Sequence, residues 1–220
     1  MSVNFDASDD FAAVSDSAET VTFHRRGATP GSPGVAVAHG LRRAVGVREA
    51  AESNGHYTAS DVVWHLPVQE LADLPHLGDV IVDAAGGRWT VLQVQLVTLR
   101  TRWRCTARSL AIVYGLDDTV TILKAAYSKG SGGAAQAIWQ TWKTGVRARI
   151  QPAAATTGSQ HRARRTTQRV QIFVAEDLAL SHDHRIQGSD GTMYHVVAVS
   201  GAQRIGELQT IEAEAVDGRQ

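Results

Sequence analysis

The chain has 220 residues, enough for one domain or for two small domains of about 100 residues each. Its hydrophobic content of 43% supports a buried core. Its formal net charge of zero argues against a function dominated by long-range attraction to nucleic acid or to a membrane. The single cysteine, Cys105, excludes an intramolecular disulfide, so the fold must be stable without one.

The N-terminal segment, residues 1–19, is strongly acidic. It has no lysine or arginine and carries Asp6, Asp9, Asp10, Asp16 and Glu19. This composition predicts a flexible acidic arm outside the core. The segment has neither a basic start nor an apolar stretch, so we expect no signal peptide. We also expect no membrane span, because no uncharged apolar run approaches the roughly 18 residues that a span needs.

Apolar and polar residues alternate with a period of two along most of the chain, which predicts short strands. In the first half we expect strands at residues 21–25, 61–66, 79–84, 88–94 and 101–113. Weak helical patterns occur at residues 41–53 and 68–74. A boundary is expected at residues 114–118, after which strands are expected at residues 119–123, 144–151, 168–175, 184–188, 193–199 and 207–216. The glycine-rich residues 130–136 are expected to form a flexible tip.

Many short strands divided by turns favour an all-β fold. We predict two tandem small β-barrels or sandwiches of five to six strands each, with long loops between strands and at most short helices. The expected domains are a flexible acidic arm at residues 1–19, a first unit at residues 20–116 and a second unit at residues 117–220.

An internal repeat supports this division. The sequence IVDAAGGRWTVL at residues 81–92 matches IQGSDGTMYHVV at residues 186–197, at a constant separation of 105 residues (186 − 81), and both predict a hairpin. The remaining matches are Val21 to Phe23 with Val120 to Ile122, Val62, Trp64 and Leu66 with Val170, Ile172 and Val174, and Trp103 with Leu208. We interpret the pattern as a tandem duplication of one strand-rich unit.

A search for catalytic motifs gives little, and we predict that the chain is not an enzyme and holds no cofactor. His182 and His184 would point the same way on a strand and could share a metal ion, but no third ligand is identifiable. Their position just before a hairpin favours a solvated turn, so no metal site is predicted. Cys105 lies on an apolar strand face with Trp103 and Ala107, which favours packing over nucleophilic chemistry.

Two basic stretches carry more information. Arg100, Arg102 and Arg104 share one face of a predicted strand, which is either a solvated outer face or a surface for an acidic partner or for DNA phosphates. Residues 156–169 form a polar, basic insertion between two strands, with Arg162, Arg164, Arg165 and Arg169. This insertion is either a mobile surface loop or a group of cations that neutralise phosphates without reading sequence.

The order of motifs in the second half resembles a known family. VTIL, at residues 120–123, is followed by Trp139 and Trp142, VRARIQP, a long polar loop, RVQIFV, HRIQGSDGTMYHVVAV and GELQTIEAEAV. This order is similar to that of the head–tail joining proteins of tailed bacteriophages, also called head-closure or stopper proteins. The resemblance covers roughly residues 119–216 directly and residues 20–113 by way of the repeat.

The resemblance implies a structural protein of the virion neck. Such a protein assembles in the host cytoplasm into a homo-oligomeric ring at the head–tail interface, between portal or adaptor proteins and the tail terminator or tail. It helps to close the head, retains double-stranded DNA through non-specific backbone contacts and docks the tail. The loop at residues 153–168 would face the DNA channel, and its counterpart at residues 40–60 would carry Arg42, Arg43 and Arg48.

Two alternatives remain open. A tail-terminator-type ring protein is also rich in strands. A single-stranded nucleic-acid-binding barrel would need exposed aromatic side chains, whereas Trp64, Trp89 and Trp103 alternate with the polar residues as core side chains do. In the ring interpretation, the acidic arm becomes ordered on assembly against a basic face of a neighbour, such as the face of Arg100, Arg102 and Arg104.

Overall fold

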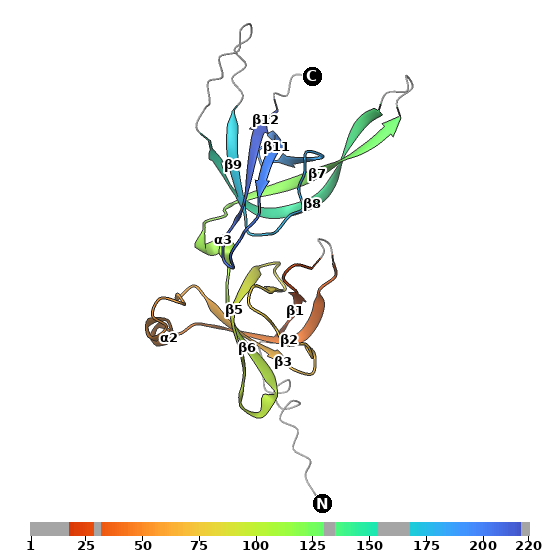
Figure 1. The fold of residues 1–220 in the computed structure, drawn as a ribbon. Coiled ribbons are helices and arrows are strands. Elements are labelled where there is room, and N and C mark those ends of the chain that lie inside the picture. Colours follow the sequence, from red (N-terminus) through yellow and green to blue (C-terminus); the bar gives the residue numbers. More distant parts are fainter. Residues whose placement is uncertain (1–17, 29–31, 130–134, 154–167, 217–220) are drawn as a thin grey trace, which may run out of the picture. The chain divides into compact units, whose positions relative to one another are not determined.

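The predicted fold class is confirmed by the computed structural model, which describes residues 18–28, 32–129, 135–153 and 168–216. The chain forms two closed antiparallel barrels in tandem, each of six strands. One compact unit comprises residues 1–113 with residues 204–206, and the other comprises residues 114–203 with residues 207–220. Figure 1 shows the order of the strands along the chain.

The strands of the first barrel follow the circuit β1-β2-β3-β6-β5-β4. Their bounds are β1 (Ala18–His24), β2 (Val35–Ala44), β3 (Val62–Pro67), β4 (Val80–Val82), β5 (Arg88–Leu96) and β6 (Arg102–Arg108). The described residues of this half include three short helical segments: α2 (Val47–Glu52), η1 (Thr98–Arg100) and α3 (Leu110–Val113). None of the described helices is long and apolar enough to span a membrane.

The second barrel repeats the same circuit as β7-β8-β9-β12-β11-β10. Its strands are β7 (Asp118–Lys129), β8 (Ala135–Pro152), β9 (Arg169–Val174), β10 (His184–Gln187), β11 (Met193–Ser200) and β12 (Gln209–Ala215). Each strand therefore has a counterpart in the first barrel, from β1 with β7 to β6 with β12. The shared circuit supports the interpretation of the chain as a tandem duplication.

The repeat extends to individual hydrogen bonds in the hairpin that first revealed it. Ile81 pairs with Trp89 across β4 and β5, and Ile186 pairs with Tyr194 across β10 and β11. The two turns contain glycines with φ near +82° and +84°, Gly86 and Gly191. Such backbone angles favour glycine, because a side chain would crowd the backbone there. The two hairpins thus use the same turn at the same place.

A strand irregularity is also repeated. The pairing of β5 with β6 shifts between Val91 and Gln93, and the pairing of β11 with β12 shifts between Val196 and Ala198. Such bulges bend a strand and help to close a barrel. One predicted match was wrong by one residue: Trp103 corresponds to Gln209, not to Leu208, because Trp103 faces Leu66 while Gln209 faces Val174.

Each barrel is filled by one face of its alternating strands. Trp64, Leu66 and Cys105 are fully buried in the first core, and Ile172 and Ile211 are fully buried in the second. The alternation that predicted strands also placed these side chains inside. Removing a large buried side chain of this kind typically costs about 3–5 kcal/mol.

In the first barrel, three features differ from the sequence prediction. β2 occupies residues 35–44, where no strand was expected, and its end overlaps the predicted helix at residues 41–53. The predicted strand at residues 101–113 ends at Arg108 and is followed by α3. Glu19, predicted as part of the flexible arm, belongs to β1, where it pairs with Gly40.

Candidate functional site

The three predicted arginines around β6 do not lie on one strand. Arg100 ends the η1 turn, where Leu99 and Arg100 have positive φ angles of 72° and 55°. Only Arg102 and Arg104 lie on β6. Arg104 forms an ion pair with Glu49 of α2 and donates a hydrogen bond to Gln95. Part of the charge on this face is therefore neutralised within the chain.

The predicted loop at residues 40–60 is not one loop. Arg42 and Arg43 lie on β2, and Arg48 lies in α2. Their carboxylate partners are within reach: Arg42 contacts Asp83 at 3.1 Å, Arg43 contacts Glu49 at 2.9 Å, and Arg48 contacts Glu52 at 2.7 Å. Each predicted DNA-facing side chain of this group has an acid beside it.

The guanidinium of Arg42 also lies 5.6 Å from the ring centroids of both Trp64 and Trp89. Trp89 Nε1 donates a hydrogen bond of 2.8 Å to the same Asp83 carboxylate that pairs with Arg42. The Arg42 guanidinium, the two tryptophan rings and the Asp83 carboxylate therefore form one cluster beside the first core. Their mutual contacts give Arg42 a packing role.

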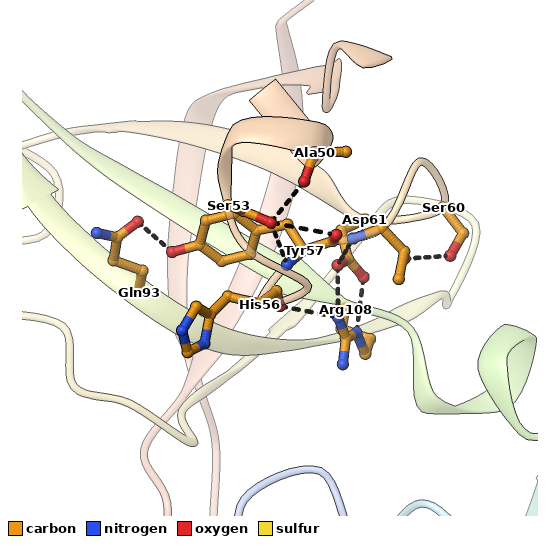
Figure 2. Close-up of polar contacts among 9 residues, drawn as sticks. Ala50, Ser53, His56, Tyr57, Ser60, Asp61, Gln93 and Arg108 are labelled. Carbon is orange, nitrogen blue, oxygen red and sulfur yellow. Dashed lines mark hydrogen bonds and ion pairs between the residues drawn. The ribbon is translucent and has the colours of Figure 1, made fainter. Parts of the chain in front are cut away.

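A buried aspartate ties the segment after α2 to the first barrel (Figure 2). Asp61 is fully buried and accepts two hydrogen bonds from Arg108, at 2.8 and 2.7 Å, and one from the backbone N–H of Thr58. Arg108 also donates to the carbonyl of His56, and the Tyr57 hydroxyl contacts Gln93 of β5. The segment is thereby packed onto the barrel wall.

The equivalent position in the second barrel carries the reverse charges. In the first barrel, Val62 pairs with Ala107, and the next residues outward are Asp61 and Arg108. In the second barrel, Arg169 of β9 pairs with Glu214 of β12 at the corresponding place. Arg169 Nε donates a hydrogen bond of 2.8 Å to Glu214. Arg169 was predicted to face DNA, and in the structure it is an ion-pair partner at the start of β9.

The other residues of the predicted DNA-facing loop, Arg162, Arg164 and Arg165, lie outside the described residues. Their predicted role stays a prediction. The sequence around them is nevertheless positively charged, because residues 119–175 contain no aspartate or glutamate.

A two-stranded arm projects from the second barrel, as Figure 1 shows. We call residues 124–129 of β7 and 135–142 of β8 the β7–β8 arm. β10 pairs with β7 only from Thr121 to Lys124, whereas β7 and β8 stay paired as far as Lys129 and Ala135. The sequence predicted strands only at residues 119–123 and 144–151, so the arm was missed.

The β7–β8 arm exposes large apolar side chains: 64% of Tyr127, 51% of Ile138 and 38% of Trp142 are accessible. The aromatic groups are nonetheless held in place. The Tyr127 hydroxyl donates a hydrogen bond of 2.7 Å to Asp183, and the Trp142 ring lies 5.2 Å from the ring of His184. Tyr127 pairs with Ala137 and Ile138 pairs with Ala126, so these two side chains lie on opposite faces and the arm exposes apolar groups on both.

The side of β8 that faces away from β7 is open over most of its length. Among the described strands, β9 pairs with β8 only from Ala148 to Pro152, so residues 135–147 have no strand on that side. An unpaired strand edge presents a row of backbone donors and acceptors and acts as a template for another strand.

The corresponding edge in the first barrel is capped. β3 pairs with β2 only from Leu41 to Ala44, and beyond that point the Glu70 carboxylate accepts hydrogen bonds from the backbone N–H groups of Ala38 and His39. Burial raises the pKa of Glu70, but hydrogen bonds from the His39 side chain and from these N–H groups outweigh it, so the pKa is lowered overall. The carboxylate remains charged and blocks the edge.

The two histidines considered as metal ligands occupy different environments. His184 is buried at the start of β10, and its Nδ1 accepts a hydrogen bond of 3.1 Å from the Ser181 N–H. His182 is exposed and lies beside Asp183. Among the residues that the structure describes, no group of three or more His, Cys, Asp or Glu side chains could hold a metal ion.

Cys105 is fully buried in the first core. Burial raises the pKa of its thiol to about 12, so the thiolate is not formed near neutral pH. The packing role expected for Cys105 is confirmed.

No protein-family model matches the chain, and no curated protein matches it. Among solved structures, the chain is similar to a chain of the virion of a native gene transfer agent (GTA) particle, with a TM-score of 0.36 and 15% identity. That match covers 44% of this chain and 93% of the other.

Proposed function

We propose that the chain is a structural protein of the neck of a tailed phage or phage-like particle. It would form a homo-oligomeric ring between portal or adaptor proteins and the tail, help to close the head and dock the tail. The order of motifs at residues 119–216, which resembles that of head–tail joining proteins, supports this proposal. We also propose that the chain has no catalytic activity of its own.

The observation that carries the proposal is the β7–β8 arm with the open edge of β8. A ring of identical copies needs head-to-tail contacts in which two different surfaces of the chain meet. An arm that exposes Tyr127, Ile138 and Trp142 beside an unpaired edge suits one half of such a contact.

The DNA contact would be electrostatic. Arg162, Arg164 and Arg165 belong to a stretch without acidic residues, so their charge has no acid nearby in the sequence to offset it. Cations on a ring that surrounds DNA would bind phosphates without reading bases.

To test this role, the three arginines are changed together to alanine, and DNA retention is measured in assembled particles. We expect the triple alanine variant to assemble and to lose DNA faster than the parent. The matched control changes the same residues to lysine, which keeps the charge and should keep retention. Unchanged retention in the triple alanine variant would overturn the DNA-facing assignment.

A single-stranded nucleic-acid-binding barrel is the second candidate, and one observation favours it. Tyr127 and Trp142 are exposed, and Lys124, Lys129 and Lys143 occupy positions on the same two strands, which is a combination of aromatic and basic residues. Salt-dependent binding of the purified protein to single-stranded oligonucleotides, lost on changing these lysines to glutamate, would favour this candidate over the ring. Trp64, Trp89 and Trp103 of the first barrel are buried, as their sequence pattern indicated, so they offer no surface on which bases could stack.

A further inference from the structure

We propose that the open edge of β8 binds the N-terminal acidic segment, residues 1–17, of a neighbouring copy as an added strand. The inference rests on the proposed ring function and names the contact that would hold the ring together. It replaces the basic face of Arg102 and Arg104 as the expected partner of the acidic segment, since that face already has Glu49 as an ion-pair partner of Arg104.

The two barrels provide an internal comparison for the edge. In the first barrel, Glu70 accepts hydrogen bonds from the outer N–H groups of β2, so another strand cannot use them without displacing this carboxylate. In the second barrel, the described structure pairs no strand with residues 135–147 of β8 on that side. Val37 pairs with Val21 as Val146 pairs with Val120, so Ala38 and His39 correspond to Arg147 and Ala148. Glu70 therefore blocks the first edge only where it leaves β3, whereas β8 continues from the equivalent point with an open edge.

The two strands of the arm are basic in sequence. Lys124, Lys129, Lys143 and Arg147 lie on β7 and β8, and residues 119–175 contain no acid. Two of these cations have acidic partners from outside this stretch: Lys143 forms an ion pair with Glu176, and Arg147 lies 3.8 Å from Asp117. A partner strand would therefore be favoured if it carried negative charge and no positive charge.

The N-terminal segment matches these requirements. It carries Asp6, Asp9, Asp10 and Asp16 and no lysine or arginine. Its stretch VNFDAS, residues 3–8, alternates apolar and polar residues with the period of a strand. Apolar side chains on one face of such a strand could cover Ile138 and Trp142, while the aspartates meet the lysines.

The length of the segment is adequate. Seventeen residues precede Ala18, where β1 begins, and the open edge spans 13 residues of β8, from 135 to 147. An added strand of similar length would run about 40 Å at roughly 3.3 Å per residue. Each copy has one such segment and one such edge, so exchange between neighbours satisfies every copy when a ring closes.

A nucleic acid strand fits the surface less well. Backbone donors and acceptors of an edge strand pair with another peptide strand, and bases offer no such ladder. The aromatic groups that could stack on bases are already engaged: Trp142 packs against His184, and Arg185 lies 4.1 Å from the centroid of the Trp139 ring. Preferential binding of an oligonucleotide at this surface would therefore contradict the proposal.

The first test uses single-cysteine variants of the full chain. One variant carries Ser8→Cys and one affinity tag, and the other carries Gln140→Cys on β8 and a different tag. Cys105 does not compete, because it is buried. After mixing and short-range cross-linking, we expect a product that contains both tags. The control replaces Gln140→Cys by Ala38→Cys, an exposed position on β2 whose backbone N–H is bonded to Glu70, and should give about tenfold less product.

Two outcomes of this test overturn the inference. The first is the absence of the mixed product. The second is a cross-link confined to single chains in the double variant Ser8→Cys with Gln140→Cys, which would show that each segment binds its own barrel.

The second test measures binding of a labelled peptide of residues 1–17 to a chain that lacks residues 2–17. We expect changing Lys124, Lys129 and Lys143 to glutamate to weaken binding by about tenfold or more, and changing the four aspartates of the peptide to asparagine to do the same. Tighter binding of a single-stranded oligonucleotide at this surface than of the peptide would contradict the proposal.

The two proposals can fail separately. If chains lacking residues 2–17 still form rings, this inference falls and the ring function stands. If the full chain forms no ring while the peptide still binds β8, the ring function falls and the edge remains a peptide-binding site.

Discussion

Asp79 and His184 occupy the same place in the two barrels, two residues before the buried Ile81 and Ile186. Asp79 Oδ2 accepts the N–H of His76 at 2.8 Å, and His184 Nδ1 accepts the N–H of Ser181 at 3.1 Å. A carboxylate and an imidazole thus close equivalent turns. Burial lowers the pKa of His184, and the neutral ring is the form that can accept this hydrogen bond.

A second histidine makes the first barrel sensitive to acid. His65 lies on β3, and burial, followed by the nearby Arg102, lowers its pKa from 6.5 to about 4. Between these pH values the unfolded chain binds a proton that the folded chain does not, so stability falls as the pH drops from 6.5 towards 4. Below about pH 4 both states are protonated and this contribution levels off.

We therefore expect His65→Gln to flatten the dependence of stability on pH within that window. The measurement is the denaturant midpoint of unfolding at several pH values between 7 and 4. The control is His182→Gln in the second barrel, where 83% of the side chain is exposed. If the unfolding midpoint depends on pH as steeply in His65→Gln as in the parent, His65 is not the group responsible for the pH dependence.

At the scale of elements, the reversed charge pairs bear on how tandem barrels avoid exchanging strands. Asp61 on the approach to β3 pairs with Arg108 of β6, whereas Arg169 of β9 pairs with Glu214 of β12. If β6 paired with β9, two arginines would meet, and if β12 paired with β3, two acids would meet. The reversal thus disfavours the wrong pairing, which is the use of charge expected where similar strands compete.

The buried pair should be the more sensitive of the two. Arg108→Glu would place a second acid against Asp61, which is fully buried, and we expect a loss of stability of about 3 kcal/mol or more. The matched variant Arg169→Glu in the second barrel places an acid against Glu214 in a half-exposed pair and should cost far less. Equal shifts in the two unfolding midpoints would contradict this ranking.

The elements also show what sequence patterns could predict. Alternation identified the strands whose one face fills a core, such as β3, β5 and β11, because burial fixes their period. β2 was missed, since Gly40 and three basic or small residues after it weaken the alternation, and its outward side is held by Glu70. The β7–β8 arm was missed because both of its faces lie outside a core, so no period-two pattern is required.

The arm had one sequence signal that could have identified it. Residues 119–175 lack acids and contain Trp139 and Trp142 outside the strands that were predicted. For the candidate arginines, the sequence showed the residues but not their contacts. The resemblance and the repeat singled out Arg42, Arg43 and Arg48, but sequence alone could not place Asp83 beside Arg42, because that contact joins residues 41 positions apart in the chain.

At the scale of the whole molecule, the arm can be separated from the barrel that carries it. Ala126 pairs with Ile138, so replacing residues 127–137 by Asn-Gly would close the hairpin with a two-residue turn. We expect this variant to keep the unfolding midpoint of the parent, because the replaced residues contribute no side chain to the described core. We expect this variant to lose self-association in sedimentation measurements. If its oligomeric state is unchanged, the arm is not part of the assembly surface.

The central claim is that the chain forms a closed ring. If relatives with one barrel form rings of about twelve, a chain with two barrels would close a ring of about six copies. Native mass measurement of the assembled protein, together with imaging of particles that carry a tagged chain, tests this directly. For a closed ring, we expect a fixed multiple of 23.6 kDa and a cyclic density at the head–tail junction. A ring of about twelve copies would refute the six-copy expectation alone, whereas a monomer at all concentrations, absent from the junction, would contradict the account.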